Sequence, residues 1–123
     1  MNDYESGRVS ELLIQVQPSR VPNLDLDSLK TQCRNLTAAL APDVEFHSEE
    51  KDGNEPYLNL RFKVKNLEAV WPELWAALYE SKQFKADLRN GSLVVCTGTD
   101  HWNDYRLLYH FDPTVLIDSI RPD

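Results

Sequence analysis

The richest cluster of residues able to do chemistry lies near the C-terminus of the chain. Asp100, His101 and Asp104 stand together in a hydrophilic stretch, and Tyr105 and His110 follow within a few residues. Histidine titrates near neutral pH, and a neighbouring carboxylate can orient its ring, so such a cluster can supply a general acid and a general base. One hypothesis is therefore a small enzyme or ligand-binding domain whose acid and base come from His101, His110, Asp100 and Tyr105.

The motifs of well-known catalytic classes are absent from the sequence. It contains no GxSxG elbow, no glycine-rich phosphate loop, no HExxH and no EF-hand spacing. The three histidines, His47, His101 and His110, share no recognised metal-ligand spacing. The sequence therefore predicts neither a metal nor a cofactor, and it favours a non-enzymatic protein.

The charge of the chain argues against nucleic acid as a partner. Twenty acidic residues against thirteen basic ones give a formal net charge of −7, which repels phosphate backbones. The acids are concentrated in residues 43–55, where Lys51 is the one cation. Such a run is usually a solvated loop, but it can also be a surface that meets a basic partner. The acids of this segment are Asp43, Glu45, Glu49, Glu50, Asp52 and Glu55.

An isolated tryptophan adds a second candidate contact. Trp102 stands in a polar stretch without periodic apolar neighbours, and an exposed tryptophan ringed by polar groups has the composition of an interface anchor. Alternatively, its ring folds back over an edge of the sheet. The predicted partner-binding residues are Glu49, Glu50, Asp52, Glu55, Asp100, Trp102 and Asp104.

Length and composition indicate one globular domain. The 123 residues are 41% hydrophobic and 27% charged, which is too apolar for a disordered chain. We expect a flexible N-terminus over residues 1–10 and a single α+β domain over 11–123. The sequence shows neither a signal peptide nor a membrane span, which predicts a cytoplasmic location. Cys33 and Cys96 form no CxxC pair and are expected to be buried.

Hydrophobic periodicity predicts alternating strands and helices. Leu12, Ile14 and Val16 alternate with polar neighbours as in a strand. From Asp25 onward, apolar residues follow steps of three and four and predict a helix that Asp25 or Asp27 can cap and that ends before Pro42. A hairpin with an Asp-Gly turn follows, then a second helix from about 70 to 79 and two apolar strands over 93–97 and 105–111. We expect the tail to dock through Val115, Leu116 and Ile120.

This order of elements is typical of one kind of fold. It predicts a ferredoxin-like βαββαβ sandwich with an extra C-terminal strand, in which two helices cover one face of an antiparallel sheet. The other face would carry mainly polar side chains, and it is either a candidate contact surface or simply a solvated outer face. Its side chains are Tyr57, Asn59, Arg61 and Lys63 of the third strand with Leu13, Gln15 and Gln17 of the first.

Together these features favour a non-enzymatic protein-binding module. A small, acidic, cytoplasmic α+β chain resembles many bacterial immunity proteins in general character, although no motif carries the likeness. The resemblance implies an antitoxin that neutralises a basic toxin domain by occluding its active site. The alternatives are a ferredoxin-like homodimer that encloses a pocket with a His/Asp pair, and a purely structural subunit.

Overall fold

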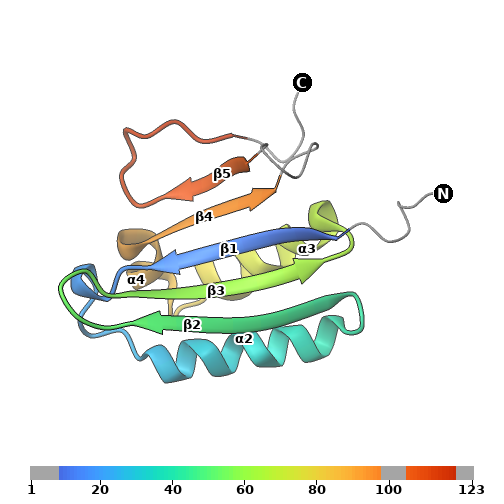
Figure 1. Ribbon diagram of the computed structural model, residues 1–123, viewed down its shortest axis with the longest axis horizontal. Coiled ribbons are helices and arrows are strands. Elements are labelled where there is room, and N and C mark those ends of the chain that lie inside the picture. The colour runs from blue at the N-terminus through green and yellow to red at the C-terminus, as the bar shows by residue number, and fades with distance from the viewer. Residues whose placement is uncertain (1–8, 98–104, 119–123) are drawn as a thin grey trace.

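The computed structural model describes residues 9–97 and 105–118 as an α+β structure with three α-helices and one five-stranded antiparallel sheet. The strands lie side by side in the order β2-β3-β1-β4-β5, with β2 and β5 at the two edges (Figure 1). The α+β class and the additional C-terminal strand are confirmed. The elements are β1 Ser10–Val16, α2 Leu26–Leu40, β2 Val44–Lys51, β3 Tyr57–Val64, α3 Leu67–Leu74, α4 Lys85–Gly91, β4 Ser92–Thr97 and β5 Tyr105–His110.

Strict alternation in the two central strands builds the core. Leu12, Ile14 and Val16 of β1 are fully buried, and they pair in register with Phe62, Leu60 and Leu58 of β3. Because successive strand residues point to opposite faces, all of these side chains lie on one side of the sheet. The buried residues of the helices join the same core cluster: Leu29, Cys33, Val70, Leu74, Leu78, Tyr79 and Leu88. The predicted burial of both cysteines is confirmed.

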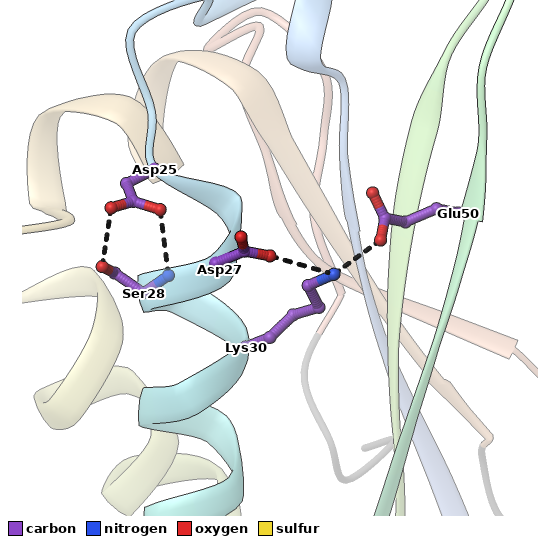
Figure 2. A network of polar contacts seen from close by, with 5 residues as sticks. All are labelled: Asp25, Asp27, Ser28, Lys30 and Glu50. Atoms are coloured by element: carbon purple, nitrogen blue, oxygen red, sulfur yellow. Dashed lines mark hydrogen bonds and ion pairs between the residues drawn. The ribbon is translucent and has the colours of Figure 1, made fainter.

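The first helix begins where its sequence places a capping carboxylate. Asp25 accepts hydrogen bonds from the backbone N–H of Ser28 at 3.1 Å and from the Ser28 hydroxyl at 2.8 Å (Figure 2). The first backbone N–H groups of a helix have no partner within it, so this side chain satisfies one of them. These hydrogen bonds also lower the pKa of Asp25.

The second helical region changes its winding after a proline. Asn66 caps α3 by accepting from the N–H of Ala69, and Pro72 lies inside the helix. Proline has no N–H to donate to the preceding turn. After it the chain forms a π-helical turn, Trp75–Tyr79, in which the rings of Trp75 and Tyr79 stack with centroids 4.8 Å apart. No helix within residues 9–97 and 105–118 is long and apolar enough to cross a bilayer.

The segment after β5 is held by hydrogen bonds and not by apolar docking. The expected anchor Leu116 is 91% exposed and Val115 is also exposed, so that prediction is wrong. Ile120 lies outside the described residues. Instead, the backbone N–H of Asp118 donates to the carbonyl of Leu107 at 2.7 Å, and the N–H of Leu107 donates to the Asp118 carboxylate at 2.9 Å. Asp118 therefore ties the tail to the outer edge of β5 at Leu107.

Candidate functional site

The acidic run of the sequence forms the hairpin of β2 and β3. Residues 52–56 connect the two strands, and Gly53 has φ 110°, a left-handed conformation that glycine adopts most easily. Asp52 and Glu55 stand exposed in this connection, and neither makes an ion pair or hydrogen bond with the described part of the chain. We call residues 52–56 the acidic tip. It presents two carboxylates with no partner among residues 9–97 and 105–118.

Glu49 lies near the tip on the face of the sheet that points away from the core. Its carboxylate accepts a hydrogen bond from Nε of Arg61 at 2.9 Å and one from Nδ2 of Asn59 at 3.3 Å. The Arg61 hydrogen bond, followed by that of Asn59, holds the pKa of Glu49 below its usual range. Its charge is therefore partly neutralised within the molecule.

Glu50 points to the opposite side of β2. Nζ of Lys30 in α2 donates to its carboxylate at 2.6 Å, and the same ammonium lies 3.5 Å from Asp27 (Figure 2). The hydrogen bond to Glu50 raises the pKa of Lys30. The four predicted acids of this hairpin thus divide into two kinds. Glu49 and Glu50 tie the hairpin to the rest of the fold, whereas Asp52 and Glu55 face outward.

A polar network extends from Glu49 across the central strands. Nε2 of Gln15 donates to Oδ1 of Asn59 at 3.1 Å, and the Arg61 guanidinium lies 3.8 Å from the carboxylate of Glu11. Asn59 is only 7% exposed although it lies on the face opposite the core, because its neighbours cover it. We call this side of β1, β2 and β3 the polar face. Its hydrogen bonds fix the side chains beside the acidic tip.

An open hollow of about 370 Å³ lies next to the acidic tip. Glu55 and Tyr57 line it together with Gln15 and Gln17. A carboxylate beside an aromatic ring suits a cationic side chain, because the ring face attracts a cation as the carboxylate does. Its lining residues are Gln15, Gln17, Ser19, Asn54, Glu55, Pro56 and Tyr57.

Two residues of the alternative acid–base site, Tyr105 and His110, belong to the described part of the chain, and they lie far from each other. Tyr105 pairs with Thr97 and His110 pairs with Leu93, so the two stand at opposite ends of β5. Five steps along a strand separate them by roughly 17 Å. Nδ1 of His110 accepts the backbone N–H of Asp112 at 3.0 Å, and both residues line a hollow of about 430 Å³ with Arg89. Asp100, His101, Trp102 and Asp104 lie outside the described residues.

Sequence reasoning placed three residues of the polar network, Gln15, Asn59 and Arg61, on a candidate contact surface but not among the predicted partner-binding residues. It placed them on the outer face but did not connect them with Glu49. The register of the hairpin sets Glu49 opposite Asn59 and His47 opposite Arg61. The Asp-Gly turn was the one sequence feature that could have indicated this register.

Comparison of the chain with protein-family models, curated proteins and solved structures finds no match. The candidate site therefore stands on its geometry and charge.

Proposed function

We propose that this chain is a non-enzymatic protein-binding module that contacts a basic partner through its acidic tip and the adjoining polar face. The observation that carries the proposal is the pair of exposed carboxylates, Asp52 and Glu55, which have no internal partner among the described residues. Carboxylates at a projecting tip attract a positively charged surface and steer its approach.

The internally paired acids contribute to this surface by holding it in place. Glu49 is bound to Arg61 of β3, and Glu50 is bound to Lys30 of α2, so both sides of β2 are fixed just before the tip. A surface that is ordered before binding loses less entropy on association. Preorganisation of the hairpin therefore supports tight as well as fast binding.

The hollow beside the tip gives the partner an anchor point. A lysine or arginine of the partner suits the hollow that Glu55 and Tyr57 line, because a carboxylate and an aromatic ring face each favour a cation. Binding energy in interfaces concentrates in a few such pockets. We expect Tyr57 and Glu55 to contribute more to affinity than the other residues of the hollow.

In its sharpest form the proposal is an immunity protein, which neutralises a toxin by occluding a basic active site. Fast electrostatic capture suits that task because the toxin must be stopped before it acts.

We also propose a finer assignment of the fold. The sheet order β2-β3-β1-β4 and the single core shared by the helices support a ferredoxin-like arrangement with helices on one face.

Affinity capture with matched baits tests the proposal. The wild-type protein, an Asp52→Lys/Glu55→Lys variant and a Glu73→Lys/Asp87→Lys control are each used as bait in lysate from the source organism, at low and then moderate salt. Both variants change the net charge equally, but the control positions lie in α3 and α4. Circular dichroism establishes that all three baits are folded.

The expected result is one basic protein, retained in stoichiometric amount by the wild type and the control, lost from the tip variant and released by salt. Retention of the same proteins by all three baits would contradict the assignment to the tip. A bait that captures nothing would contradict the binding proposal itself.

The hollow beside His110 favours a second candidate, a ligand-binding domain. The backbone N–H of Asp112 donates to Nδ1 of His110, which leaves Nε2–H as a donor on a residue that lines this hollow with Arg89. If no protein partner is captured, a metabolite screen with wild type and His110→Ala tests this candidate. Binding that the substitution weakens would support it.

A further inference from the structure

The two edges of the sheet differ in what covers them. At β5, Leu107 uses both its N–H and its carbonyl to bind Asp118, so the chain's own tail binds the middle of that edge. At β2, no hydrogen bond among the described residues reaches the backbone of Val44–Lys51 except those of its ladder with β3. An uncovered edge strand of eight residues can pair with another strand.

The side chains on the polar face of β2 alternate between acidic and basic groups. Glu45, His47, Glu49 and Lys51 are all exposed, and they pair with successive residues of β3 without a bulge. This sequence of acid, imidazole, acid and ammonium does not match a uniformly basic strand. When a second copy of β2 runs antiparallel to the first, however, the acidic positions of one copy can lie opposite the basic positions of the other.

We propose that a second copy of this chain binds here, through antiparallel pairing of β2 with β2 about a two-fold axis at Ser48. In this register Glu45 of one copy lies opposite Lys51 of the other, and His47 lies opposite Glu49. Each pairing occurs twice, as a two-fold axis requires. Glu49 can accept from the second copy's imidazole while it remains bound to Arg61, because a carboxylate has about four acceptor sites.

Neighbouring registers lack this complementarity. A shift by one residue would place the polar face of one copy beside the core face of the other, because strand side chains alternate. A shift by two residues in one direction sets Glu45 opposite Glu49, and in the other direction it sets Glu49 opposite Glu49. Like charges directly opposite in a sheet are destabilising. The charge pattern therefore selects both the partner and the register.

This inference does not rest on the proposed function, because its observations are the uncovered backbone edge of β2 and the order of the charged groups along it, and it requires no basic partner at the acidic tip. Sedimentation velocity of the wild type, Glu45→Lys, Lys51→Glu and the double variant tests it. Each single substitution places two like-charged pairs in the interface, so we expect a dimer about tenfold weaker. The double variant exchanges the charges and should restore the dissociation constant to within about threefold of the wild type. Circular dichroism controls for folding.

Cross-linking tests the register directly. Differently tagged Glu45→Cys and Lys51→Cys proteins are mixed and treated with a short bismaleimide. We expect linkage between the two different tags. Glu45→Cys alone should give almost no dimer, because its two cysteines would be roughly 20 Å apart. Three results would each overturn the proposal. In sedimentation, they are a wild type that stays monomeric up to about millimolar concentration and a double variant that does not regain the wild-type dissociation constant. In cross-linking, it is linkage of Glu45→Cys with itself that equals its linkage with Lys51→Cys.

Discussion

Glu49 and Glu50 are consecutive in the sequence, yet they bind cations from different parts of the fold. Glu49 accepts from Arg61 of β3 on the polar face, whereas Glu50 accepts from Lys30 of α2 on the other side of the sheet. The alternation of a β-strand separates them. A run of acids in the sequence is thus not one patch in space, and the proposed binding surface centres on Asp52 and Glu55.

The pairing of Glu49 predicts a pH dependence of stability. Its pKa is lower in the folded protein than in the unfolded chain, so its ionised form stabilises the fold above the ordinary carboxyl pKa. This contribution to stability is lost as the pH falls through the lowered pKa of Glu49. We expect the free energy of unfolding to fall more steeply on acidification in the wild type than in Glu49→Gln. Urea titrations from neutral pH down to about pH 3 measure the difference; parallel curves would show that the pair does not matter.

The buried hydroxyl chain at Tyr79 predicts unequal effects of two small substitutions. Ser92 Oγ donates to the carbonyl of Leu88 at 2.6 Å and lies 2.6 Å from the Tyr79 hydroxyl. The single Ser92 proton is used toward Leu88, so Tyr79 is the donor in the second bond. Tyr79→Phe removes one hydrogen bond and should cost about 1 kcal/mol, whereas Ser92→Ala removes two and should cost about 2–3 kcal/mol. Thermal or urea unfolding checks the order, and a larger loss for Tyr79→Phe would contradict it.

The two cysteines should be unreactive in the folded protein. Cys33 is fully buried and Cys96 is 2% exposed, and burial raises the pKa of the Cys33 thiol to about 12. The thiolate is the reactive form, so a thiol-specific reagent at pH 8 should label neither residue until denaturant is added. Absorbance of released thionitrobenzoate counts the thiols in each state. Rapid labelling without denaturant would contradict the burial of these side chains.

Much of the fold followed from local patterns in the sequence. Alternation in β1 and β3, the carboxylate before α2 and the Asp-Gly turn each act over a few residues, and each prediction is confirmed. The tail could not be predicted in the same way. Leu116 is apolar but exposed, because the segment is fixed by backbone and carboxylate bonds between Asp118 and Leu107.

The candidate site was predicted only in outline. Composition indicated the acidic segment, but contacts across long sequence separations determine which of its carboxylates are bound to cations within the fold. The Lys30–Glu50 pair joins residues twenty positions apart, and no local pattern places α2 against that end of β2. The predictions for Asp100, His101, Trp102 and Asp104 stay predictions, since these residues lie outside the described part of the chain.

The most direct test of the proposed function is the rate at which the captured basic partner associates with this protein. Stopped-flow measurements compare the wild type, Asp52→Lys/Glu55→Lys and the Glu73→Lys/Asp87→Lys control over a range of ionic strength. We predict that the tip variant associates about tenfold or more slowly at low salt, that the control stays closer to the wild type, and that the differences shrink as salt is added. An association rate that is the same for the tip variant and the control would contradict binding through the acidic tip.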